Sequence, residues 1–131
     1  MSEAVPDGLV RIAPGNELPL HVARERVTAA VRQACASGAR GLLADFHDWR
    51  GGQSPSLAMR IDSTKEWAAA AASVPGFALA LVMPPEMVDP GRIGPILGSR
   101  LGFRFDVFGD VDEALAWLTG ELEASRPQRR G

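Results

Sequence analysis

Two long segments of the chain repeat apolar residues at the spacing of an α-helix. The first covers about 20–36 and is followed by Gly38, a residue suited to a left-handed C-terminal cap. The second covers about 57–73, and Ser56 is placed to cap its N-terminus. We expect the apolar stripe of this second helix to consist of Leu57, Ile61, Thr64, Ala68 and Ala71.

Other short segments have the length and composition of β-strands. Residues 41–46 and 77–83 are almost wholly apolar, as strands are when helices cover both faces of a parallel sheet. Residues 103–108 alternate apolar and charged side chains, which predicts an edge strand with one wet face. Residues 8–13 form a short first strand that ends at a Pro-Gly turn.

The last third of the chain adds two helical segments. Prolines and glycines interrupt residues 85–101, for which we predict a broken helix. After the fourth strand, Asp110 is placed to cap a final helix, and Glu113 follows at the spacing of a capping box.

The alternation of strands and helices predicts an α/β fold with right-handed crossovers. We expect one domain over 8–122, with a four-stranded, mostly parallel sheet and about four helices. Residues 1–7 and the arginine-containing segment 123–131 are predicted to be flexible ends.

The strands at 42–46 and 78–82, and the segment 107–118 that ends in Ala-Leu-Ala-Trp-Leu, together resemble a known family. The chain is similar over 8–122 to bacterial STAS domains, the anti-sigma-factor antagonist-like fold, and especially to variants grouped with the CRAL-TRIO fold. The resemblance implies a regulatory or protein-interaction domain. Phosphorylatable members carry an Asp-Ser-Ser-Gly-like stretch where the second helix begins. Residues 50–56 of this chain contain serines but not the Asp-Ser-Ser-Gly order.

Charge and composition exclude several classes of function. The formal net charge is −2, and a dedicated nucleic-acid binder would need a basic stripe to displace counterions. No apolar run approaches the ~20 residues that cross a bilayer, and the first residues lack a signal-peptide pattern. Cys35 is the one cysteine, so no disulfide can form within the chain. We therefore predict a cytoplasmic protein without membrane insertion.

The polar loop after the second strand is the best candidate site. Ligands of open α/β sheets bind beyond the carboxyl ends of the strands, and the next helix N-terminus offers free N–H groups to an anion. The alternatives are a plain polar loop with a serine N-cap, or phosphorylation of Ser54 or Ser56. The residues that we predict to contact a ligand or partner are Asp45, His47, Asp48, Trp49, Arg50, Ser54 and Ser56.

Several other residues have a structural and a functional interpretation. Trp49 is either a lid over the core or an exposed anchor for a partner. Trp67 and Trp117 are predicted to pack in or near the core, His21 to lie on the surface, and Cys35 to be a small core residue rather than a nucleophile.

No sequence motif for catalysis or cofactor binding is present. The chain lacks the Gly-x-Ser-x-Gly, Gly-x-Gly-x-x-Gly and Walker-type patterns. We expect no metal at Asp45, His47 and Asp48, because successive residues at a strand end point in different directions and a site needs three or four convergent ligands.

Two functions follow from this sequence. The first is a non-enzymatic, STAS-like regulatory or protein-interaction domain of a bacterial cytoplasmic protein. Its contact surface would be the 47–56 loop and the second helix, and homodimerisation is a further option. The alternative is a carrier of a small lipid-like or phosphorylated ligand, bound between the helices and the strand ends with 84–101 as a lid. An enclosed apolar pocket would favour the carrier, and a filled core would argue against it.

Overall fold

The computed structural model describes residues 8–15, 17–50 and 54–124. Their elements, in chain order, are β1 (Leu9–Ile12), α1 (Leu20–Ala36), β2 (Gly41–Asp45), α2 (Leu57–Ala70), β3 (Ala78–Val82), the short 3-10 helix η1 (Pro85–Met87), α3 (Ile93–Arg100), β4 (Arg104–Phe108) and α4 (Val111–Ala124). The flexible ends predicted for 1–7 and 125–131 lie outside the described residues, whereas α4 includes residues 123 and 124, which were assigned to the tail.

The strands form one sheet in the order β1-β2-β3-β4, and every pairing is parallel. Val10, Leu42, Leu79 and Phe105 are aligned in register across it. The predicted α/β fold, with the apolar segments 41–46, 77–83 and 103–108 side by side, is confirmed. Each crossover passes through a helix, as parallel neighbours require.

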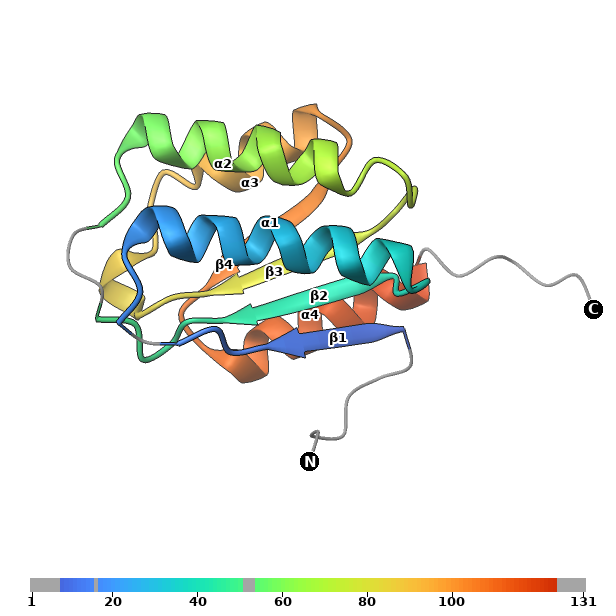
Figure 1. Ribbon diagram of the computed structural model, residues 1–131, viewed down its shortest axis with the longest axis horizontal. Helices are drawn as coiled ribbons and strands as arrows, with labels where there is room; N and C mark the ends of the chain where they lie inside the picture. The colour runs from blue at the N-terminus through green and yellow to red at the C-terminus, as the bar shows by residue number, and fades with distance from the viewer. Residues whose placement is uncertain (1–7, 16, 51–53, 125–131) are drawn as a thin grey trace, which may run out of the picture.

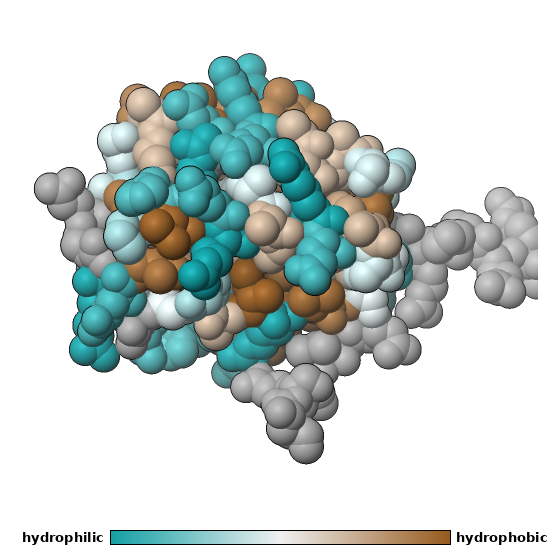
Figure 2. Space-filling model, viewed as in Figure 1, coloured by the Kyte–Doolittle hydropathy of each residue, from teal (hydrophilic) through white to brown (hydrophobic). Residues whose placement is uncertain are grey.

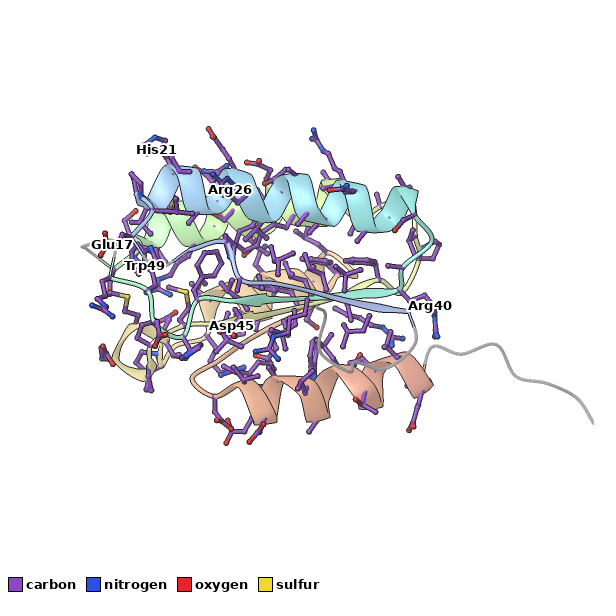
Figure 3. All side chains as sticks on the ribbon, turned by 60° about the horizontal axis from the view of Figure 1, so that its bottom comes forward. Glu17, His21, Arg26, Arg40, Asp45 and Trp49 are labelled. Carbon is purple, nitrogen blue, oxygen red and sulfur yellow. The ribbon has the colours of Figure 1, made fainter. Side chains whose placement is uncertain are left out.

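Helices cover both faces of the sheet. Helices α1, α2 and α3 lie together on one face, and α4 lies across the other (Figures 1 and 3). The central strands β2 and β3 are therefore enclosed on both sides, which is the physical reason for their continuous apolar sequences. Strand β4 lies at an edge of the sheet, as its sequence pattern predicted, but its burial does not alternate: Phe105 is buried and the other four side chains are half-buried.

The two faces of the sheet have different cores. Large side chains fill the side of α1–α3, where the Trp67 and Phe105 rings meet edge to face with centroids 5.6 Å apart. On the other face, Ala78 and Ala80 are small, so α4 packs close to β3 and buries Leu118 completely. Around α1, Figure 2 shows a mixed surface with hydrophobic residues gathered between that helix and the sheet edge.

Side-chain caps fix the starts of two helices where the sequence predicted them. The Ser56 hydroxyl accepts a hydrogen bond from the backbone N–H of Met59 at 3.1 Å. The Asp110 carboxylate accepts one from the N–H of Glu113, also at 3.1 Å. Each cap satisfies an N–H group that has no partner within the helix.

The apolar stripe predicted for α2 is confirmed only in part. Thr64 and Ala71 are buried and Ile61 and Ala68 are half-buried, but Leu57 is 62% exposed. The buried face is turned toward Ser63 and Trp67, which the prediction did not include. The cause is Trp67, whose large ring packs against Phe105 and outweighs the smaller aliphatic side chains in setting the rotation of the helix. The helix also ends at residue 70, earlier than the predicted 73.

The predicted broken helix over 85–101 resolves into η1 and α3. Between them the Asp89 carboxylate accepts hydrogen bonds from the N–H groups of Gly91 and Ile93, and it thereby caps α3. Arg92 precedes α3 with φ +53°, a left-handed conformation that side-chain-bearing residues rarely adopt.

Candidate functional site

A cavity of about 80 Å³ lies between the sheet and helices α1, α2 and α3, at the carboxyl ends of β2–β4. Protein interiors leave few voids larger than a water molecule, so this space is a distinctive feature. Most of its lining is apolar, and the principal apolar side chains are Leu20, Val27, Phe46, Trp67, Leu81 and Phe105.

Small residues on the surrounding helices form part of the cavity lining. Ala23 of α1, Ser63 of α2 and Gly94 of α3 all line the space. At Gly94 even a Cβ atom would come within 3.0 Å of Cε2 of Phe105, so α3 lies directly on β4 there. The rings of Trp67 and Phe105, which meet edge to face, form another part of the lining.

Trp49 borders the cavity beyond the end of β2. Its side chain is buried, with 3% exposure, and its indole N–H donates to the backbone carbonyl of Leu18 at 2.9 Å. Figure 3 shows Trp49 near the start of α1, at the opposite end of the sheet from Arg40. This position agrees with the lid interpretation and not with an exposed anchor.

Arg24 and Arg92 lie at the cavity and are held by carboxylates. Glu66 accepts two hydrogen bonds from the Arg24 guanidinium and one from the Thr28 hydroxyl, the latter at 2.7 Å. The hydrogen bond from Thr28 lowers the pKa of Glu66 and outweighs the opposing effect of burial, and Arg24 lowers the pKa further. Arg92 forms an ion pair with Asp106 of β4. Both cations are therefore neutralised locally.

Arg60 and Ser63 also line the cavity, but in the described part of the chain neither side chain is bound to a carboxylate. The Arg60 guanidinium donates to the backbone carbonyls of Pro55 at 3.2 Å and Met87 at 3.3 Å. It thereby links the start of α2 to η1. Ser63 is 5% exposed, and its hydroxyl has no hydrogen-bond partner among the residues that the structure describes. The cavity thus has an apolar body with one hydroxyl and a nearby cation.

The predicted site in the loop after β2 forms a separate hollow. Asp45, His47 and Asp48 line it together with Ala13 and Gly15, and Trp49 contributes to both hollows. The hollow measures about 290 Å³, is more open than the cavity, and has the charged side chains of Asp45 and Asp48 in its wall. Arg50, Ser54 and Ser56 are exposed, and residues 51–53 lie outside the described part of the chain.

Asp45 is a buried carboxylate surrounded by hydrogen-bond donors. Its oxygens lie 3.0 Å from Nη2 of Arg11, 2.7 Å from Nδ1 of His47 and 3.0 Å from the backbone nitrogen of His47. Burial acts to raise the pKa of Asp45, but the hydrogen bonds from His47 and Arg11 outweigh it, and the pKa is lowered. The hydrogen bond to Asp45 and its negative charge raise the pKa of His47.

This cluster corrects the expectation that the strand-end side chains diverge. His47 returns to Asp45 because the chain turns immediately after β2, where the N–H of Trp49 donates to the carbonyl of Phe46. The other ring nitrogen of His47 lies 3.2 Å from Asp48. Each ring nitrogen is thus taken up by a carboxylate, so the imidazole fastens the loop.

The described residues contain no group of three or more His, Cys, Asp or Glu side chains arranged to hold a metal ion. Cys35 lines neither hollow, and burial raises the pKa of its thiol, which disfavours the reactive thiolate. His21 is exposed on the outer side of α1, as predicted (Figure 3). Trp67 is buried, and Trp117 is half-buried against Phe108 with ring centroids 5.7 Å apart.

The sequence did not indicate Ala23, Arg60, Ser63, Gly94 or Arg92 as site residues. One usable signal was present, the adjacent Ser63 and Thr64 one turn before Trp67, since polar residues on a buried helix face require an explanation. A second was the pair Gly94 and Gly98, whose spacing places both on the same face of a helix.

Comparison of the chain with protein-family models, curated proteins and solved structures found no match. The resemblance to STAS domains therefore remains an expectation from the sequence. In the part of the chain that the structure describes, no helix has both the length and the apolarity needed to cross a membrane.

Proposed function

We propose that this domain binds a small, largely apolar molecule in the cavity beneath α1, α2 and α3. The observation that carries the proposal is the unfilled, apolar space at the carboxyl ends of β2–β4. This is the end at which open α/β sheets bind their ligands. A polar loop without a pocket would not need to leave space between Ala23, Ser63 and Gly94.

The size of the cavity limits its ligand. An engineered cavity of about 150 Å³ in another protein holds benzene, whereas this one measures about 80 Å³. A six-carbon aliphatic chain therefore enters only if neighbouring segments move to enlarge the space. Trp49 and the segment containing η1 and Asp89 border the space and are the parts that would shift for entry.

Titration of the protein with 1-hexanol tests the proposal. Trp49 and Trp67 line the cavity, so binding should change the tryptophan fluorescence saturably and raise the melting temperature. The Ala23→Leu variant fills the space and should lose binding. Ala29→Leu makes the same change on the exposed side of α1 and should bind as the wild type does.

Two results would argue against the ligand-binding function. The first is the absence of any saturable signal with the wild-type protein. The second is unchanged binding by an Ala23→Leu variant whose circular dichroism shows a normal fold. Mass spectrometry of the purified protein under native conditions offers an independent check, because a retained ligand would appear as added mass.

A regulatory or protein-interaction role in a bacterial cytoplasm is the second candidate. One observation favours it: Leu57 is 62% exposed at the start of α2, beside the polar loop that contains Arg50 and Ser54. Single exposed apolar side chains are common on protein surfaces, so Leu57 supports a partner contact, of which homodimerisation is one form, less strongly than the cavity supports ligand binding. Size-exclusion chromatography with light scattering, on wild type and Leu57→Ser, tests the homodimer directly.

A further inference from the structure

The polar side chains that line the cavity differ in whether they have a hydrogen-bond or ion-pair partner within the protein. Arg24 and Arg92 are paired with carboxylates. The Thr64 hydroxyl donates to the carbonyl of Arg60 at 2.8 Å. Asp89 accepts two backbone N–H groups at the start of α3. The charges of Arg24 and Arg92 are thus balanced by carboxylates, and the Thr64 hydroxyl and the Asp89 carboxylate are hydrogen-bonded within the protein.

Ser63 is the first exception. Its side chain lies on α2 at the cavity with 5% residue exposure, and among the described residues nothing forms a hydrogen bond with its hydroxyl. No described buried polar atom is both sealed from solvent and unpaired, so the Ser63 oxygen retains exposure, which we assign to the cavity. Buried hydroxyl groups are normally hydrogen-bonded, and a ligand in the cavity would supply the missing partner.

Arg60 is the second exception. It donates to two uncharged carbonyls, and within 8–15, 17–50 and 54–124 no carboxylate forms an ion pair with it. The charge of Arg60 reaches Asp89 only at longer range, where it contributes to the lowered pKa of that carboxyl. A half-buried guanidinium beside an apolar space, without a paired anion, attracts an anionic group.

Ser63 and Arg60 stand three residues apart on α2, so their side chains lie on the same face of that helix. We infer that the cavity binds a monocarboxylate with a short apolar chain, whose carboxylate is held by the Ser63 hydroxyl and the Arg60 guanidinium. This inference rests on the proposed function. One hydroxyl and one unpaired cation match the single charge of a carboxylate better than the higher charge of a phosphate monoester. The apolar lining and small volume receive the chain.

Calorimetric titration of the full chain with hexanoate and with 1-hexanol, which share a chain length, tests the inference. Hexanoate should bind about tenfold more tightly, as expected for charge-assisted hydrogen bonds. Arg60→Gln should weaken hexanoate by about tenfold and leave 1-hexanol within about twofold. Arg60→Lys keeps the charge and should retain part of the preference for the acid. Ser63→Ala should weaken hexanoate severalfold.

Matched controls are available on exposed positions. Arg26 is exposed on α1 (Figure 3) and does not line the cavity, so Arg26→Gln should bind hexanoate as the wild type does. Ser99→Ala makes the hydroxyl deletion on the exposed side of α3 and should likewise have no effect. These variants separate a specific contact from a general change in charge or stability.

The outcomes distinguish this inference from the proposed function. Equal affinity for hexanoate and 1-hexanol, or an undiminished preference for the acid in Arg60→Gln, overturns the carboxylate site while ligand binding stands. Tighter binding of hexyl phosphate than of hexanoate overturns the assignment of the head group. Failure of all three molecules to bind overturns both. If Arg60→Gln does not fold, the acid-to-alcohol ratio of the wild type and of Ser63→Ala decides the question.

Discussion

Gly98 lies where α3 packs directly against β4. A Cβ atom built at this position would be 3.2 Å from the backbone oxygen of Phe103 and 3.3 Å from Cβ of Phe105. Neither atom is the end of a flexible side chain, and the N–H of Phe103 is already bonded to the carbonyl of Gly98 at 2.8 Å. Gly98→Ala must therefore push the helix away from the strand.

The expected magnitude is the difference between two effects. Overpacking a tight contact costs about 1–3 kcal/mol. Replacing a glycine by alanine within a helix stabilises by about 0.5–1 kcal/mol. We therefore expect Gly98→Ala to lower the free energy of unfolding by about 0–2.5 kcal/mol, with a middle value of about 1 kcal/mol. Gly120 in α4 has no atom within 4 Å of its would-be Cβ, so Gly120→Ala should raise the free energy by about 0.5–1 kcal/mol.

Urea unfolding followed by circular dichroism and tryptophan fluorescence measures both changes. Trp67 contacts Phe105, the strand residue beneath Gly98, and therefore reports on this part of the core. The dependence on urea should keep the same slope in both variants, because the surface exposed on unfolding is unchanged. The packing of α3 described above would be wrong if Gly98→Ala were as stabilising as Gly120→Ala.

Three further perturbations follow from single contacts. Leu118→Ala should lower the free energy of unfolding, measured in urea, by about 2–5 kcal/mol, because Leu118 is fully buried. Leu57→Ala should change it by less than about 0.5 kcal/mol, because Leu57 is 62% exposed. A similar loss in both variants would contradict the assigned rotation of α2. Ser56→Ala should cost about 1 kcal/mol through loss of the α2 cap, and an unchanged melting temperature would refute the cap. The stabilisation from the His47–Asp45 pair should be greatest between pH 3.8 and pH 6.5, which are the ordinary pKa values of the two groups. The difference in free energy of unfolding between wild type and His47→Ala, measured across pH, tests this. The stabilisation is lost as the pH rises through the raised pKa of His47 and as it falls through the lowered pKa of Asp45, so a pH-independent difference would exclude the contact.

Local rules account for what the sequence determined by itself. A continuous apolar run must be covered on both faces, so 41–46 and 77–83 were identified as the central strands of a parallel sheet. Alternation along 103–108 identified an edge strand for the same reason. Ser56 and Asp110 were identified as caps because the hydrogen bond reaches only three residues along the chain.

The tertiary structure alone decided the cavity and the groups that face it. Ala23, Ser63 and Gly94 come from helices far apart in the sequence, and only their packing leaves the space between them. The rotation of α2, which turned Ser63 inward and Leu57 outward, was set by the contact of Trp67 with Phe105 on a distant strand. Whether Arg24, Arg60 or Arg92 forms an ion pair depended in the same way on whether a carboxylate from another segment lies close to it. Whether a space stays unfilled depends on how side chains from separate segments pack, and whether a charge is paired depends on how close those segments bring it to an opposite charge. Neither can therefore be predicted from a local pattern in the sequence.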